Sequence, residues 1–167
     1  MSKLVNAQDV DMWLHAAIDA NHLYLGLRSI SCTGNQYWGT DGCRIHISSQ
    51  KPFNYNPHAF ETEARFLKFH ESSDKWDIAW QGVLPASNLY KGADYACCNC
   101  PDPEDNPMQF KGYLFNPKFV KDAILVMHGD ITAQLLVSPE NDKRACLHLV
   151  RHELSNQFEA YIMCRLP

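Results

Sequence analysis

The chain has no apolar run near the roughly 20 residues that a membrane-spanning helix needs, although 46% of its 167 residues are hydrophobic. Its N-terminal residues also lack the apolar core of a signal peptide. We therefore expect a soluble, cytoplasmic protein with no membrane partner. Thiols stay reduced in that compartment, so the 7 cysteines are expected to be free. Their odd number would leave at least one unpaired in any compartment.

The patterns that carry common enzymatic chemistries are also missing. The 8 glycines are scattered, so the chain has no phosphate-binding glycine loop. No serine stands in the Gly-x-Ser-x-Gly arrangement of hydrolases. Pairs of acidic residues lie in turn-rich stretches, where they are typical of a solvated surface. We therefore expect neither catalysis nor a bound cofactor.

Two amphipathic helices are the clearest elements that the sequence does contain. Asn6 can cap the first helix, and apolar residues follow with helical spacing as far as Ile18. The second is expected to begin after Asn116, with Pro117 in the first helical position, and to end at Gly129.

Most of the remaining chain is predicted to form antiparallel strands joined by turns. A short helical turn is expected over 85–92, and the cysteine- and proline-rich stretch 97–107 is expected to be a loop. An interruption is predicted at Asp41–Gly42 within the second strand. The predicted strands are 23–32, 36–47, 66–70, 76–80, 131–137, 145–150 and 158–166. The order helix, strands, loop, helix, strands predicts an α+β fold in a single domain, 1–167.

Three segments, taken in order, resemble the bacterial DNA polymerase sliding clamp family. The first reads Thr-Asp-Gly-Cys-Arg-Ile over 40–45, where the family typically has Thr-Asp-Gly-His-Arg-Leu. The second begins a helix with Phe-Asn over 115–116, and the third is the tail Met-Cys-Arg-Leu-Pro over 163–167. The family's tail resembles Met-Pro-Met-Arg-Leu. Cys43 therefore replaces the usual histidine, Cys164 a proline, and Pro167 extends the end.

The resemblance implies a specific architecture. A clamp is a ring built from copies of one domain, and each domain has two halves of a helix plus antiparallel strands. This chain is expected to be one such domain, with its helices on one face of the sheets and its halves related by a pseudo-two-fold axis. The first half would span about 1–84, a loop-rich insertion about 92–108, and the second half about 110–167.

The resemblance also implies a partner-binding site. In the family the turn and the tail line an apolar pocket that accepts short peptides from polymerases and other proteins. They come from neighbouring domains there, so here we expect them to meet across a subunit contact. The candidates are Thr40, Gly42, Cys43, Arg44, Ile45, Met163, Arg165 and Leu166. The alternative is an ordinary tight turn at Asp41–Gly42, with Ile45 in the core and Arg165 solvated at an edge.

Charge argues against a ring that works on DNA. Helices that face DNA should present basic side chains, because neutralising phosphates supplies most sequence-independent affinity. The second helix offers Lys118 and Lys121, whereas the first carries Asp9, Asp11 and Asp19 in a stretch without Lys or Arg. This balance favours a non-enzymatic clamp-like protein that binds replication or repair proteins or clamp-binding peptides. A phage or other mobile element is a compatible origin for such a single-domain relative of replication proteins. The alternative is a true processivity ring formed by self-association. The sequence does not decide between the two, so whether the protein contacts DNA stays an open question.

A third hypothesis is a small zinc protein or enzyme. Cys97, Cys98 and Cys100 are its candidate ligands. Structural zinc needs four ligands, and no second Cys-x-x-Cys or His-x-x-x-His pair follows. The simpler interpretation is a loop with reduced thiols.

Overall fold

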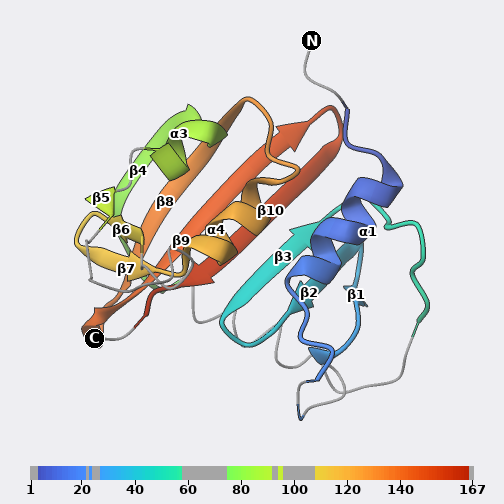
Figure 1. Cartoon of the computed structure of the whole chain (residues 1–167), viewed down its shortest axis with the longest axis horizontal. Coiled ribbons are helices and arrows are strands. Elements are labelled where there is room, and N and C mark those ends of the chain that lie inside the picture. Colours follow the sequence, from blue (N-terminus) through green and yellow to red (C-terminus); the bar gives the residue numbers. More distant parts are fainter. Residues whose placement is uncertain are drawn as a thin grey trace.

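The computed structural model describes residues 4–21, 23, 27–57, 75–91, 94–95 and 108–165. Seven of the described strands form one antiparallel sheet, and three short strands form a second (Figure 1). The larger sheet has the order β1-β2-β3-β10-β9-β8-β4. The fold is therefore α+β, as the sequence predicts. None of the described helices has the length and apolar character needed to cross a membrane.

The described helices are α1 (Ala7–Ala16), α3 (Ala86–Lys91) and α4 (Pro117–Ile124). The strands of the larger sheet are β1 (Ser31–Thr33), β2 (Gln36–Thr40), β3 (Arg44–Ser48), β4 (Asp77–Pro85), β8 (Asp130–Ser138), β9 (Asn141–Glu153) and β10 (Asn156–Met163). The smaller sheet contains β5 (Asp94–Tyr95), β6 (Met108–Phe110) and β7 (Tyr113–Phe115).

Both longer helices begin where the sequence predicts. The Asn6 side chain accepts a hydrogen bond from the Asp9 backbone N–H at 2.9 Å, and the Asp9 carboxylate accepts one from the Asn6 N–H at 3.2 Å. This reciprocal pair is a capping box. Asn116 caps α4 by accepting a hydrogen bond from the Lys118 N–H at 3.0 Å, and Pro117 is the first helical residue. The caps therefore fix the residue at which each helix begins.

The larger sheet is assembled from two meanders that meet at its centre. Strands β1, β2 and β3 form one meander and β8, β9 and β10 the other, and β3 pairs antiparallel with β10. Helix α1 packs on β2 and β3, α4 packs on β10, and the two helices contact each other. They therefore share one face of the sheet (Figure 1).

Two strand predictions in the first meander are wrong. The strand expected over 23–32 begins only at Ser31, which pairs with Trp38. The pairing cannot extend far toward the N-terminus of β1, because its partner strand β2 ends at Thr40. The interruption expected at Asp41–Gly42 is confirmed, but the chain reverses there, so the single strand expected over 36–47 is a hairpin of two strands, β2 and β3. The first arm of the hairpin expected over 66–80 lies outside the described residues.

Apolar side chains lie on both faces of the sheet. The main core lies between the sheet and the helices and includes Trp13, Leu147 and Phe158. Along β3, Ile45 and Ile47 alternate with the helix-facing residues, so they point to the other face. A second buried cluster lies there and contains Trp38, Ile45, Ile47, Leu136, Cys146 and Tyr161. Trp38 is 1% exposed, so its indole is part of the packed core on this face.

The contact between α1 and β2 is close enough to require glycine at position 39. A Cβ atom added there would lie 2.5 Å from the Leu14 carbonyl oxygen, which belongs to the helix backbone.

We expect Gly39→Ala to lower the free energy of unfolding by about 2 kcal/mol or more, because α1 must shift off the strand. Urea denaturation measures the loss. Ser155→Ala, at an exposed turn, should change it by less than about 0.5 kcal/mol, and equal values for the two variants would contradict the prediction.

Candidate functional site

The candidate site starts from the β2–β3 turn, where each residue type has a structural role. One carboxylate oxygen of Asp41 accepts hydrogen bonds from the backbone N–H groups of Cys43 and Arg44, at 2.9 and 3.1 Å. The Thr40 hydroxyl donates to the Arg44 carbonyl and accepts from the Gly42 N–H. Gly42 has a φ of +92°, a conformation that favours glycine. The sequence Thr-Asp-Gly-x-Arg therefore specifies a rigid, self-bonded turn.

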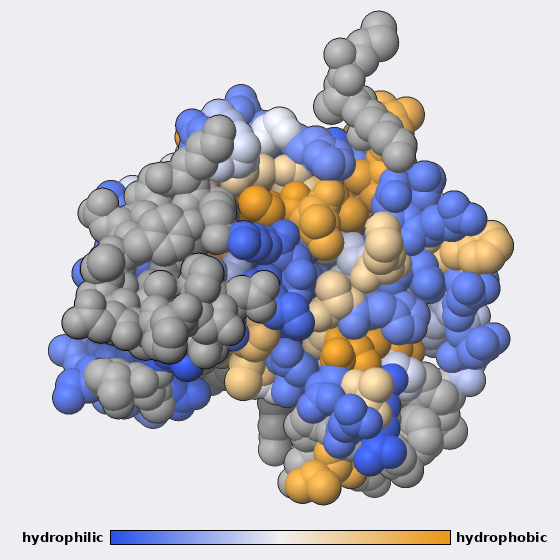
Figure 2. Space-filling view, viewed as in Figure 1, coloured by the Kyte–Doolittle hydropathy of each residue, from blue (hydrophilic) through white to orange (hydrophobic). Residues whose placement is uncertain are grey.

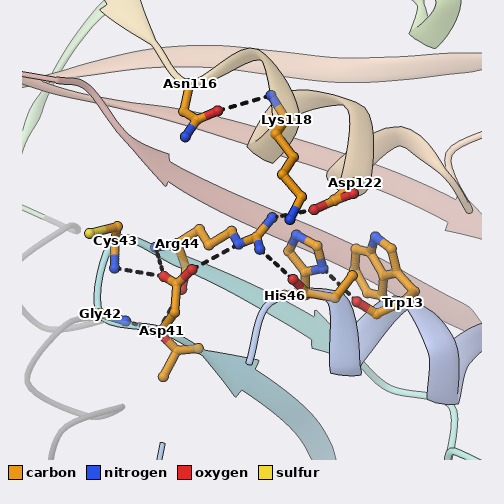
Figure 3. A network of polar contacts seen from close by, with 11 residues as sticks. Trp13, Asp41, Gly42, Cys43, Arg44, His46, Asn116, Lys118 and Asp122 are labelled. Atoms are coloured by element: carbon orange, nitrogen blue, oxygen red, sulfur yellow. Dashed lines mark hydrogen bonds and ion pairs between the residues drawn. The ribbon is translucent and has the colours of Figure 1, made fainter. Parts of the chain in front are cut away.

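Arg44 ties this turn to both helices (Figure 3). Its Nη1 lies 2.7 Å from Asp122 Oδ2 on α4, and its Nε lies 3.1 Å from Asp41 Oδ2. Its Nη2 donates to the carbonyl oxygen of Ala16, the last residue of α1. A cation at a helix C-terminus also interacts favourably with the helix dipole. The guanidinium carbon lies 4.1 Å from the centroid of the Phe119 ring.

Most of the side chains predicted for partner binding at the turn are buried. Arg44 is 5% exposed, and Thr40 and Ile45 are buried as well. Gly42 and Cys43 are exposed. Arg44 therefore acts as a positioning residue that holds the turn, and Gly42 and Cys43 form the surface that a partner could touch.

The turn and the C-terminal segment lie side by side within one chain. The Met163 N–H donates to the Cys43 carbonyl oxygen at 2.9 Å, directly after the pairing of Ile162 with Arg44. The chain then crosses to β7, where the Arg165 N–H donates to the Leu114 carbonyl at 2.7 Å. The expectation that turn and tail need a subunit contact to meet is therefore wrong, because β10 pairs with β3 of the same domain. The Arg165 side chain is exposed, whereas Leu166 lies outside the described residues.

The exposed thiol of Cys43 is not set up for nucleophilic chemistry. Partial burial, and next the charge of Asp41, raise the pKa of Cys43 above its usual value, with the Arg44 guanidinium opposing them. A thiol with a raised pKa is mostly protonated at neutral pH, and the thiolate is the reactive form. Cys43 therefore presents a neutral thiol at the surface of the turn.

The basic residues proposed to face DNA are placed on the helix-covered face. Lys118 and Lys121 of α4 are exposed, and Asp122 between the helices is already paired with Arg44. Asp9 and Asp11 belong to the neighbouring α1. The cysteines proposed as metal ligands, Cys97, Cys98 and Cys100, lie outside the described residues. Within the described ranges, no group of three or more His, Cys, Asp or Glu side chains could hold a metal ion.

Sequence reasoning missed a buried histidine behind the turn. His46 is fully buried, and its ring stacks on the Trp13 indole with centroids 4.5 Å apart. His46 Nδ1 lies 2.8 Å from the Trp13 carbonyl oxygen, so Nδ1 carries the proton and donates it. His46 Nε2 has no hydrogen-bond partner among the described residues. The sequence pattern that could have predicted it is the alternation along β3. Ile45 and Ile47 point to one face of the sheet, so residue 46 points to the face that the helices cover.

This histidine should make stability fall in mild acid. Burial lowers the pKa of His46 from 6.5 to about 3, and the nearby Arg44 charge also lowers it, while the Trp13 carbonyl opposes the shift. Between these two pH values His46 is protonated in the unfolded chain but not in the folded protein, so the free energy of unfolding falls as the pH falls. The contribution is about 1.4 kcal/mol for each pH unit below about 6.

Urea denaturation at several pH values between 7 and 5 measures this slope. His46→Asn, which keeps a donor at the Nδ1 position, should flatten it even though the ring stack is lost. The same slope in both proteins would show that other groups cause the acid sensitivity.

Comparisons of the chain with protein-family models, with curated proteins and with solved structures give no match.

Proposed function

We propose that this protein is a non-enzymatic binding module of clamp-like architecture that engages replication or repair proteins through the surface formed by the β2–β3 turn and the end of β10. The observation that carries the proposal is the direct contact of the two segments that the clamp resemblance singles out. They are far apart in sequence, yet Met163 hydrogen-bonds to Cys43.

The order of the elements supports the architectural part of the proposal. Helix α1 precedes the meander β1-β2-β3, and α4 precedes the meander β8-β9-β10. The third strand of each meander pairs antiparallel with the other at the centre of the sheet. A pseudo-two-fold axis between β3 and β10 would exchange the two halves, as the resemblance implies.

The surface around the turn supports a recognition role. Cys43 and Arg165 present exposed side chains at the end of the sheet where the Met163 side chain is half-buried. The backbone beneath them is fixed by the Arg44 network, so a partner would meet a preformed surface and lose less affinity to ordering.

Peptide binding tests this function. The probes are fluorescein-labelled peptides from the clamp-binding segments of bacterial polymerases, titrated by fluorescence anisotropy. Saturable binding is expected, and Cys43→Arg with Arg165→Glu should weaken it about tenfold, or about 1.4 kcal/mol. Leu154→Asp is the matched control, because Leu154 is exposed in the β9–β10 turn at the opposite end of β10. Failure of every peptide to bind at about 1 mM, or equal binding by the double variant, would refute the proposal.

A processivity ring is the second candidate, and one observation favours it. Strand β4 is nine residues long and forms an edge of the larger sheet, and no other described strand pairs with its outer side. Unpaired edges can join sheets of neighbouring subunits. Light scattering after size-exclusion chromatography decides between the two candidates. A monomer at micromolar concentration favours the binding module, and a closed oligomer favours the ring.

A further inference from the structure

A cleft of about 200 Å³ lies between α1 and the segment that follows α4. Its floor is formed by the buried side chains of Val5, Trp13 and Val126. Its rim carries Leu4, Met12 and Leu125, which are 60, 63 and 54% exposed. Figure 2 shows apolar surface gathered between the two helices. Three large exposed apolar side chains around one hollow distinguish this place from isolated surface leucines, which need no explanation.

The walls of the cleft are held in place by buried polar contacts. The Val5 N–H donates to Glu153 Oε1 at 3.0 Å, which fixes the chain just before α1. On the opposite wall, the Val126 carbonyl accepts a hydrogen bond from Arg151 Nη1. Both anchoring side chains project from β9 and are themselves buried. The cleft is therefore preformed, which lowers the ordering cost of binding.

The size of the cleft limits what it can take. A closed apolar cavity of about 150 Å³ accommodates benzene, so this cleft fits one aromatic or branched aliphatic side chain. It cannot by itself supply the roughly 1,000 Å² that a stable contact between two copies of the chain would bury. A short segment with a single anchoring side chain matches these dimensions.

Charge indicates what should flank that anchor. Among the described residues, Asp9 is the one Asp, Glu, Lys or Arg side chain that lines the cleft, beside His128. The Asp9 carboxylate is held at the rim by its capping hydrogen bond from the Asn6 N–H. No Lys or Arg among the described residues lines the cleft to offset it. Electrostatic complementarity therefore calls for a basic residue next to the apolar one.

We propose that this cleft binds a peptide segment of a partner protein, which inserts one Leu, Met or Phe side chain and places an adjacent Lys or Arg against Asp9. Met12 suits this role, because a flexible thioether side chain adapts to different apolar anchors. The cleft lies on the helix-covered face, away from the β2–β3 turn, so this binding does not depend on the function proposed above.

Selection from a phage-displayed library of random 12-residue peptides tests the proposal, with the full chain as the target. Enriched peptides should combine an apolar anchor with a neighbouring Lys or Arg. The double variant Met12→Gln, Leu125→Asn should bind the synthesised peptides at least tenfold more weakly than the unaltered protein. Leu154→Asp, an equally drastic change at an exposed leucine elsewhere, should bind them unchanged. Circular dichroism checks that each variant is folded.

Chemical-shift mapping with the synthesised peptide locates the site. Shifts at Met12, Leu125 and His128 support the proposal. The absence of enrichment, enrichment of acidic peptides, or unchanged binding by the double variant would overturn it. A dimer that forms at high concentration and is lost in the double variant would also overturn it, because the occupant would then be a second copy of the chain.

Discussion

Replacing Trp13 with alanine is expected to lower the free energy of unfolding by about 4 kcal/mol, among the largest losses for a single truncation of a core side chain. The indole is 1% exposed and lies where α1, α4 and the sheet meet. Its Nε1 donates to the Ala123 carbonyl of α4 at 2.9 Å, its ring stacks on His46, and it meets the Phe158 ring edge-on. Alanine would leave a cavity and an unsatisfied carbonyl together.

Urea denaturation with Trp13→Ala and Trp13→Phe separates these two effects. Phenylalanine fills most of the volume but cannot donate to Ala123, so it should lose about 1–3 kcal/mol. Phe53→Ala removes an exposed ring and should lose less than about 0.5 kcal/mol. A loss for Trp13→Ala no larger than that of the control would show that α1 and α4 do not depend on this indole.

Replacing Arg44 with methionine is expected to cost about 3 kcal/mol, close to the effect of breaking a buried ion pair by removing one partner. The aliphatic stem is largely preserved, so the loss reports on the guanidinium. Asp41, Asp122 and the Ala16 carbonyl would each lose a charged donor. The stability of Arg44→Lys should lie between that of the unaltered protein and that of Arg44→Met. A lysine keeps the positive charge, but one ammonium group cannot reach all three acceptors in the geometry of a guanidinium.

A double-mutant cycle with Asp122→Asn isolates the pair across the 2.7 Å contact. The combined loss should be smaller than the sum of the single losses. Arg165→Met is the matched control, because its side chain is exposed, and it should change stability by less than about 0.5 kcal/mol. Additive losses, or an Arg44 variant as stable as the Arg165 variant, would contradict the role assigned to Arg44. If an Arg44 variant binds a partner more weakly, the cause would be the loss of the side chain that holds the β2–β3 turn in place. Substitution of Cys43 is therefore the better test of direct contact with a partner.

The local features of the fold could be predicted from the sequence because they depend on neighbouring residues. Asn6 and Asn116 cap helices through backbone groups two or three positions away. Gly34, with a φ of +60°, allows the tight turn that joins β1 to β2, which lies in the gap left between the strands predicted over 23–32 and 36–47. The short strands β6 and β7 were not predicted, since three-residue strands have too few positions to show an alternating pattern.

The candidate site could be predicted only as a list of residues, because its geometry depends on distant partners. The sequence gives no indication that Arg44 reaches Asp122, and it therefore suggested an exposed binding residue where the structure has a buried support. It likewise did not reveal that Met163 lies beside Cys43. Both outcomes follow from one long-range event, the pairing of β3 with β10, which no local pattern encodes.

That central pairing has a consequence for how the molecule is made. Strand β3 ends at Ser48 and β10 begins only at Asn156, yet the two are neighbours in the middle of the sheet. While the ribosome is still synthesising the chain, β3 has an open side that is closed only when β10 emerges. Pairings between distant segments are slow to form, and exposed strand edges invite association between chains. The nascent protein should therefore need protection from self-association until β10 has been synthesised.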